Sequence, residues 1–171
     1  ELITDVIERD SGAIYPTKHV QRMAELGFLG MLVDVKYDGG GMDTVSYVLA
    51  MEEISKVDSS ASVIMSVNNS LVCYGLEAFG TEAQKEKYLK PLARGEKIGA
   101  FLLSEPNAGS DATSQKTTAV DMGDYYLVNG TKNWITNGNT AGTYLVIAQT
   151  HPEKMHKGIN CLIVDRHAPG I

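Results

Sequence analysis

Cysteine and histidine are scarce in this sequence, and their scarcity excludes several kinds of site. Only two cysteines occur among 171 residues, Cys73 and Cys161, and neither belongs to a CxxC pair. A disulfide framework and a structural zinc site both need several cysteines at characteristic spacings, so we expect neither and predict two buried free thiols. The four histidines show no ligand spacing either. The sequence therefore predicts no metal site.

Long hydrophobic runs and an excess of basic residues are also missing. No apolar run approaches the roughly 20 residues that span a bilayer, and no secretory signal pattern is present. Fifteen Lys and Arg against 21 Asp and Glu give a net charge of −6, which opposes binding to nucleic acid or to an anionic membrane. We expect a soluble protein without either partner, in the cytoplasm of a bacterium or the mitochondrial matrix of a eukaryote.

Hydrophobic periodicity predicts helices throughout residues 1–97. Asp43 or Thr44 can cap a helix whose apolar residues lie on one face, and residues 60–79 form a longer and more apolar helix. Residues 81–84 have the spacing of a capping box, in which a threonine hydroxyl and a glutamine amide satisfy exposed backbone donors. This part of the chain therefore reads as an all-helical domain.

The pattern changes near residue 97, and residues 98–171 favour strands. Short runs rich in β-branched and aromatic residues are separated there by turn formers. We expect strands at residues 98–103, 115–121, 125–128, 131–136, 144–149 and 159–165, with hairpin turns at residues 122–124 and 129–130. The sequence thus predicts an α+β fold, with a helical domain at 1–97 followed by an incomplete antiparallel β domain at 98–171.

Two polar stretches interrupt the strand-rich part. FLLSEPNAGSD at residues 101–111 starts as an apolar strand and ends in a run of turn formers with two carboxylates, which taken alone is a turn. In TKNWITNG at residues 131–138, Trp134 and Thr136 alternate along the predicted strand and so face one side of the sheet. An indole beside a hydroxyl makes a stacking platform with one polar contact. A core tryptophan beside a solvated threonine fits this strand equally well.

Four stretches together carry a resemblance to a known family. They are FGTEAQKEKYL at 79–89, LARGE at 92–96, FLLSEPNAGSD at 101–111 and VNGTKNWITNG at 128–138. In order and spacing they closely resemble the acyl-CoA dehydrogenase family, and short-chain, butyryl-type members most. The resemblance implies a helical N-terminal domain, a middle β domain and a C-terminal helical bundle. This chain matches the first and about half of the second, so we interpret it as a piece of a longer chain without the bundle.

The family resemblance implies a flavoenzyme with a defined reaction. It implies an FAD-dependent oxidoreductase of fatty acid β-oxidation that converts an acyl-CoA thioester to trans-2-enoyl-CoA and passes electrons to an electron-transfer flavoprotein. The catalytic base is expected to be a glutamate beyond Ile171, so we expect no catalytic residue in this chain. Family members are usually homotetramers, and the isolated 171 residues are expected to bind FAD poorly and to be inactive.

The same resemblance assigns binding residues. The strand from Phe101 to Ser104 would follow the pyrimidine edge of the flavin, Trp134 would cover a ring face and the Thr136 hydroxyl would bond to N5. Ser110 would contact the CoA part of the substrate. The expected cofactor-binding set is Phe101, Leu102, Leu103, Ser104, Ser110, Trp134, Ile135 and Thr136.

Several interpretations compete at other positions. Glu105 and Asp111 form a carboxylate pair that suggests acid–base catalysis, but we interpret Glu105, which precedes Pro106, as a brace for the turn. The run of residues 68–70, Asn-Asn-Ser, can line an acyl pocket or make a helix–helix or subunit contact. Two other functions stay open: a flavin-dependent monooxygenase of the same fold, and a non-catalytic acyl-CoA-binding or interaction protein.

Overall fold

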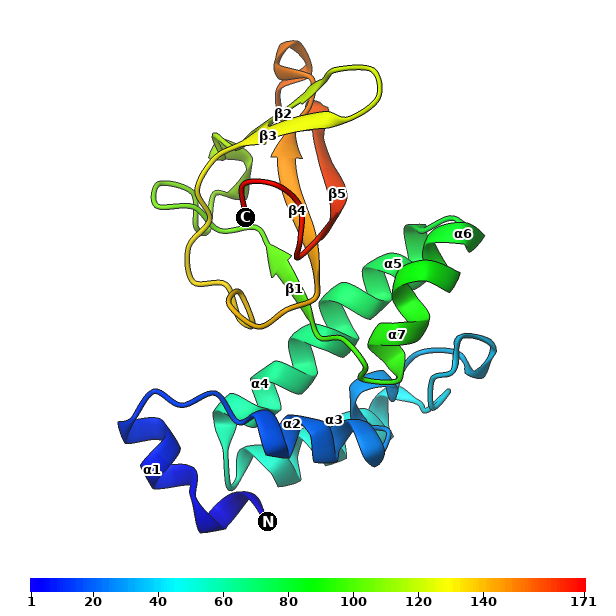
Figure 1. Cartoon of the computed structure of the whole chain (residues 1–171), viewed down its shortest axis with the longest axis vertical. Coiled ribbons are helices and arrows are strands. Elements are labelled where there is room, and N and C mark those ends of the chain that lie inside the picture. The colour runs from blue at the N-terminus through cyan, green and yellow to red at the C-terminus, as the bar shows by residue number, and fades with distance from the viewer. The chain divides into compact units, whose positions relative to one another are not determined.

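The computed structural model describes residues 1–171 and divides them into two units, Glu1–Gly99 and Ala100–Ile171 (Figure 1). The first unit is helical and the second is built on a sheet. This confirms the predicted α+β class. None of the helices combines the length and the hydrophobicity that a bilayer-crossing segment requires.

The helical unit contains seven α-helices. They are α1 (Val6–Ser11), α2 (Thr17–Glu25), α3 (Thr44–Ser55), α4 (Ser59–Ser66), α5 (Tyr74–Phe79), α6 (Glu82–Gln84) and α7 (Lys90–Ala93). Two π-helical segments, Val67–Cys73 and Lys85–Leu89, connect α4 to α5 and α6 to α7. Each pair therefore forms one continuous helix, as Figure 1 shows for α4 and α5. The predicted helix at 60–79 is present, with wider turns in its middle.

Local sequence determines where two of these helices begin. The Asp43 carboxylate accepts the Ser46 N–H at 2.8 Å and caps α3. Thr81 and Gln84 form the predicted capping box, because the Thr81 N–H donates to Gln84 Oε1 at 2.8 Å and the Gln84 N–H donates to Thr81 Oγ1 at 3.3 Å. Each cap satisfies N–H groups that the first helical turn leaves unpaired.

Two fully buried asparagines connect the helices of this unit. Asn68 Nδ2 donates to the carbonyl oxygens of Leu29 at 2.8 Å and Leu92 at 3.2 Å. Its Oδ1 accepts the Gly99 N–H at 2.9 Å. Asn69 bonds to main-chain groups in the same way. Of the roles that the sequence left open, the structure therefore supports the helix–helix contact for both asparagines.

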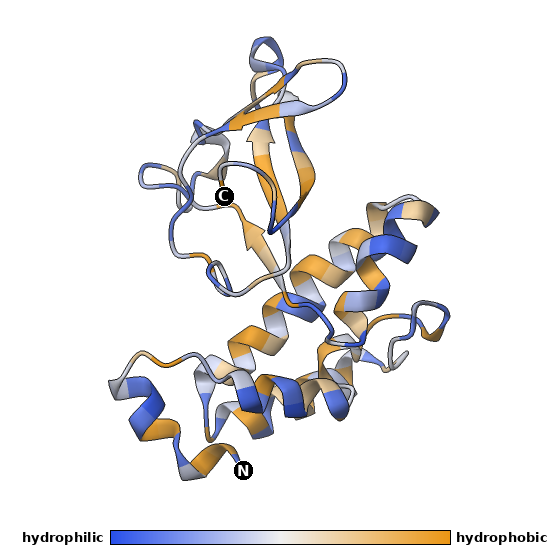
Figure 2. Cartoon of the chain, viewed as in Figure 1, coloured by the Kyte–Doolittle hydropathy of each residue, from blue (hydrophilic) through white to orange (hydrophobic).

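The second unit is organised around β4. The strands are β1 (Gly99–Leu102), β2 (Thr118–Asp121), β3 (Tyr126–Asn129), β4 (Thr143–Gln149) and β5 (Ile159–Asp165), and hydrophobic residues fill most of β4 and β5 (Figure 2). β4 pairs with β1, β2 and β5, and β2 pairs with β3. The β4–β5 and β2–β3 pairs are antiparallel, but β2 runs parallel to β4 where Thr118 meets Gln149. The sheet is therefore mixed rather than wholly antiparallel.

The predicted hairpin at residues 122–124 is confirmed. It joins β2 to β3, and Gly123 has a φ of 93°. The Asp121 carboxylate accepts the Gly123 N–H at 2.8 Å, and the Met122 N–H donates to the Tyr125 carbonyl at 2.9 Å. Glycine fits here because it has no Cβ to oppose a positive φ.

The predicted hairpin turn at Asn129 and Gly130 is wrong. β3 ends at Asn129, and no strand follows it until β4. Gly130 lies instead against Thr117, where a Cβ would come within 2.2 Å of Oγ1. Close packing, rather than a turn conformation, therefore requires glycine at this position.

The strand predicted at residues 131–136 is also wrong. This segment has no ladder partner, and Trp134 has a φ of 58°, outside the region that a strand allows. Asn137 follows with a φ of 65°. Trp134 and Thr136 therefore do not share a sheet face through strand alternation.

The two cysteines lie in different environments. Cys73 is fully buried in the helical unit, as predicted. The prediction is wrong for Cys161, which is exposed on β5 next to exposed Asn160. β5 is an edge strand that pairs only with β4, so less of the chain covers it.

Candidate functional site

The candidate site begins where β1 ends. Beyond Leu102 the chain leaves the sheet, and Glu105 and Ala108 exchange two main-chain hydrogen bonds of 3.0 and 3.1 Å. These bonds close a turn around Pro106 and Asn107. Farther on, the Asp111 carboxylate accepts the hydroxyls of Thr113, at 2.6 Å, and of Ser114. The run of turn formers is thus a closed elbow, as its composition predicted.

The segment at residues 131–138 lies against this elbow. The Asn133 N–H donates to the Ser104 carbonyl at 2.9 Å, which joins the two candidate segments directly. Ile135 packs on the core cluster of the β unit. The buried members of that cluster are Ala100, Ala141, Tyr144 and Val146. The structure therefore brings the predicted residues of both stretches together, through a non-local bond and shared packing.

Trp134 points away from that core. Trp134 is 96% exposed, while the neighbouring Ile135 is half-buried in the cluster. Thr136, two residues on, is half-buried. An indole that folding leaves almost wholly in water offers a large flat apolar surface for a ligand.

A buried ion pair supports the elbow from inside. The Lys132 ammonium lies 2.8 Å from Glu105 Oε1, and the two side chains are only 7% and 6% exposed. The same ammonium donates to the Leu103 carbonyl and to Gln115 Oε1, each at 3.0 Å. Lys132 therefore connects the end of β1 to the segment that carries Trp134.

The Glu105 carboxylate accepts hydrogen bonds from other groups besides Lys132. Its carboxylate accepts the N–H groups of Lys116 at 2.6 Å and Thr117 at 3.0 Å. Burial by itself would raise the pKa of Glu105, but the Lys132 ammonium and these N–H groups outweigh burial and lower the pKa to about 2. Glu105 is ionised and fully bonded at neutral pH, so it braces the elbow, as predicted, and is unsuited to take a proton from a substrate.

Asp111 is occupied in a similar way. Hydrogen bonds from the Ser114 and Thr113 hydroxyls lower the pKa of its carboxyl group. Its partners lie one turn further along the same segment and hold it at the base of a short 3₁₀ helix, Ala112–Ser114. The paired-carboxylate reading therefore finds no support in the geometry.

The groups that remain available fit a planar heteroaromatic ligand. The N–H and hydroxyl of Ser104 form no hydrogen bond within the chain, and neither does the Thr136 hydroxyl. These donors lie on the two joined segments, beside the exposed indole of Trp134. Hydroxyl and N–H donors together with an exposed indole are the chemistry that the flavin of FAD requires, because its ring carries nitrogen and oxygen acceptors on its edge. Ser110 is exposed on the elbow, and no hydrogen bond joins it to the other segment.

Sequence reasoning missed Lys132. A lysine between turn formers and an aromatic residue is typical of a solvated loop. Its acceptors come from residues 17 to 29 positions earlier in the chain. No local pattern could therefore have identified it, and only the folded backbone shows that its ammonium is buried.

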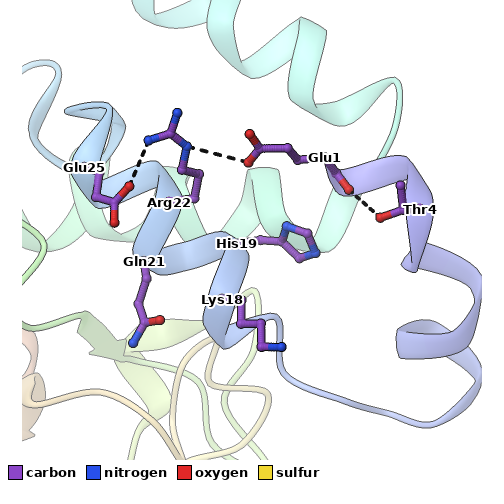
Figure 3. A pocket seen from close by; sticks show the side chains of 7 residues that line it. All are labelled: Glu1, Thr4, Lys18, His19, Gln21, Arg22 and Glu25. Atoms are coloured by element: carbon purple, nitrogen blue, oxygen red, sulfur yellow. Dashed lines mark hydrogen bonds and ion pairs between the residues drawn. The ribbon is translucent and has the colours of Figure 1, made fainter.

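A separate hollow in the helical unit has the character of ordinary surface. Figure 3 shows Arg22 with its guanidinium directed toward Glu25, 2.8 Å away, and Glu1, 3.6 Å away. The hollow is shallow and is lined by Glu1, Thr4, Lys18, His19, Gln21, Arg22 and Glu25. His19 also contacts Asp5 at 2.9 Å. The charged side chains around the hollow largely pair with one another, so the hollow offers no concentrated charge of either sign to a ligand.

Comparison with known proteins covers both units. The family model described as "Acyl-CoA dehydrogenase, N-terminal domain" matches residues 1–96, and the one described as "Acyl-CoA dehydrogenase, middle domain" matches residues 100–171. The chain is 44% identical over 163 residues to a short-chain specific acyl-CoA dehydrogenase of Clostridium acetobutylicum. That match covers 95% of this chain and 43% of the relative.

Solved structures give the same result. A butyryl-CoA dehydrogenase from Megasphaera elsdenii superposes with a TM-score of 0.94 at 43% identity, over 99% of this chain and 45% of that one. A structure described as an electron transferring flavoprotein of Acidaminococcus fermentans gives a TM-score of 0.95 at 46% identity, over 98% and 44%. The chain thus spans less than half the length of the proteins it matches.

Proposed function

Because the chain belongs to the acyl-CoA dehydrogenase family, we propose that it supplies the helical and middle β domains of an FAD-dependent acyl-CoA dehydrogenase that acts on short-chain thioesters. The domains divide near residue 97. The observation that supports this proposal most is the hydrogen bond from the Asn133 N–H to the Ser104 carbonyl, because it joins the end of β1 to the segment that carries the exposed Trp134. The similarity to two short-chain enzymes supports the choice of substrate.

The reaction removes a proton from the α carbon of the thioester and a hydride from its β carbon. When bound, FAD would supply the two-electron acceptor that this hydride requires. The residues of this chain bind and orient that cofactor. The Ser104 hydroxyl and the N–H groups of Leu103 and Ser104 would hold the pyrimidine edge of that cofactor and offset the negative charge that develops there. The Thr136 hydroxyl would donate a hydrogen bond to N5, and Trp134 would cover one ring face and exclude water.

The complete set of binding residues extends the two segments on either side. Ser110 contacts the CoA part of the substrate. The proposed cofactor-binding residues are Phe101, Leu102, Leu103, Ser104, Ser110, Trp134, Ile135 and Thr136. By resemblance to the family, the base that takes the α proton is a glutamate outside residues 1–171, and the lowered pKa values of Glu105 and Asp111 make neither of them a better candidate.

The partners follow from the same proposal. Electrons leave through an electron-transfer flavoprotein, and the similarity to a structure described as an electron transferring flavoprotein supports this partner. The active assembly is a homotetramer, located in a bacterial cytoplasm or a mitochondrial matrix. The isolated chain of 171 residues binds FAD weakly and turns over no substrate.

An anaerobic visible spectrum of the purified full-length protein tests the proposal. We expect an oxidised-flavin band that bleaches when butyryl-CoA is added. A yellow protein that no acyl-CoA bleaches would favour a flavin-dependent monooxygenase of the same fold. A protein that purifies without colour and takes up no FAD would favour a non-catalytic acyl-CoA-binding protein.

A further inference from the structure

Lys132 occupies a central place beneath the two segments of the proposed flavin site. We propose that Lys132 is a positioning residue that fixes the Trp134 segment against the end of β1 and thereby sets the affinity and reduction potential of the flavin. This inference rests on the proposed function, because it concerns the same site. The Lys132 ammonium already has three protein acceptors, so in this role it acts through the main chain and Glu105 rather than on a ligand.

Three hydrogen bonds fix the position of the Lys132 ammonium. A lysine ammonium has three N–H donors and no acceptor. Here it has three oxygen partners, the Leu103 carbonyl at 3.0 Å, Glu105 Oε1 at 2.8 Å and Gln115 Oε1 at 3.0 Å. Donors and acceptors therefore match in number, and the ammonium cannot shift toward one partner without lengthening its bond to another.

The fixed ammonium matters for the site because Lys132 lies next to the residues that form it. Lys132 immediately precedes Asn133, whose N–H donates to the Ser104 carbonyl at 2.9 Å, and it lies two residues before Trp134. One main-chain bond alone would let the segment pivot about Ser104. A second anchor on Leu103, the preceding residue, removes that freedom. The two bonds together fix the main chain from which the Trp134 side chain projects, relative to the end of β1.

The buried charge explains why a lysine and not a neutral side chain fills this position. The Glu105 side chain is only 6% exposed. Its carboxylate accepts hydrogen bonds from the N–H groups of Lys116 and Thr117, the two residues that precede β2. An ionised carboxylate at this depth needs a positive partner, and removing one member of a buried pair leaves the other uncompensated. The pair therefore joins the end of β1, the start of β2 and the Trp134 segment.

The test compares two changes at Lys132 with one at an exposed lysine. In the full-length protein, Lys132→Met keeps the length of the side chain and removes the charge, and Lys132→Arg keeps the charge but offers planar donors. Lys116→Met is the matched control, because the Lys116 side chain is exposed and only its main-chain N–H contacts Glu105. The FAD dissociation constant is measured by titrating apoprotein, and the reduction potential by equilibration with a redox dye.

The FAD dissociation constant responds to the geometry of Lys132, and the reduction potential responds to its charge. We expect Lys132→Met to weaken FAD binding about tenfold or more and to lower the potential, because the uncompensated carboxylate disfavours negative charge on the flavin. Lys132→Arg should weaken FAD binding at least threefold with little change in potential, because the charge is retained but the three-donor geometry is lost. Lys116→Met should stay within twofold of the wild type in affinity.

Clear results would overturn the proposal. Wild-type affinity in Lys132→Met, or in Lys132→Arg, would show that Lys132 does not position the site. If Lys132→Met does not fold, Gln115→Met removes one acceptor without changing the charge. It should weaken FAD binding about threefold, and unchanged affinity in that variant would refute the inference.

Failure of the proposed function has a different appearance. A wild-type flavoprotein that no acyl-CoA reduces would contradict the proposed reaction, and the dissociation constants of the variants would still decide the role of Lys132. A wild type that acyl-CoA reduces, with variants of unchanged affinity, would refute the role of Lys132 alone. A wild type without affinity for FAD would overturn both.

Discussion

Replacing Asn68 by alanine should remove a large part of the stability of the helical unit. The side chain is fully buried and makes three hydrogen bonds with main-chain groups, to the Leu29 and Leu92 carbonyls and from the Gly99 N–H, at 2.8, 3.2 and 2.9 Å, besides a longer one to the Cys73 sulfur at 3.8 Å. Alanine can make none of them, and water has no access to replace them. The three main-chain groups belong to three separate parts of the unit, so the loss is shared by several contacts.

The expected magnitude follows from these contacts. Each intramolecular hydrogen bond contributes about 1 kcal/mol to the free energy of unfolding, and a buried group left without a partner costs about 1–3 kcal/mol. We therefore expect Asn68→Ala to lower the free energy of unfolding by about 3–4 kcal/mol. For a unit of this size, each kcal/mol corresponds to roughly 4–8 °C in melting temperature. The unit should melt at least about 12 °C lower.

Urea unfolding of the 171-residue chain, followed by far-ultraviolet circular dichroism, measures this loss. Ser70→Ala is the matched control from the same π-helical segment, because its hydroxyl bonds only within one helix turn, to the Ser66 carbonyl at 2.7 Å and the Ser66 hydroxyl. We expect that control to change stability by less than about 1 kcal/mol. A loss below about 1 kcal/mol in Asn68→Ala, or an equal loss in both variants, would refute the reasoning.

Three further predictions concern other parts of the chain. Folding lowers the pKa of Glu105 from 4.5 to about 2, so the ionised carboxylate stabilises the native state above pH 4.5. This contribution to the free energy of unfolding, as much as about 3 kcal/mol, disappears as the pH falls from 4.5 to 2. Urea unfolding should lose stability more steeply in that window for the wild type than for Glu105→Gln, and equal slopes would speak against the ion pair. A thiol reagent should modify exposed Cys161 but not fully buried Cys73, whose pKa burial raises, and mass spectrometry showing two labels without denaturant would contradict this. Gly130→Ala places a Cβ within 2.2 Å of a threonine side-chain oxygen and should cost about 1–3 kcal/mol of unfolding free energy, whereas Gly109→Ala, with open space around it, should cost less. Equal melting temperatures for the two alanine variants would contradict the close packing.

The features that the sequence predicted correctly depend on local chemistry. Asp43, the Thr81 capping box and the hairpin at Gly123 each need only partners within three or four residues, so their spacing in the sequence is sufficient to identify them. The division into a helical and a sheet-containing part follows equally from periodicity. The brace at Glu105 was predictable from the proline that follows it, although its partners were not.

The candidate site was only partly predictable because long-range contacts determine its backbone. The alternation of Trp134 and Thr136 is typical of a strand, yet the Asn133 N–H bonds to the Ser104 carbonyl, the Lys132 side chain is buried, and Trp134 has a positive φ. Likewise, Asn129 and Gly130 form a common turn sequence, but no turn forms here. The position requires glycine because Thr117 lies against it and leaves no room for a Cβ. Propensity was overridden in each case by a residue distant in the chain.

The conformation of Trp134 has a consequence for protein engineering. A bulky residue in the left-handed region costs about 1–3 kcal/mol, and an indole that is 96% exposed gains almost nothing from folding in return. A glycine at this position would relieve the backbone. Selection of this chain for heat resistance alone would therefore favour variants that lack Trp134, and a thermostable library would have to be screened for flavin colour at the same time to keep the ligand surface.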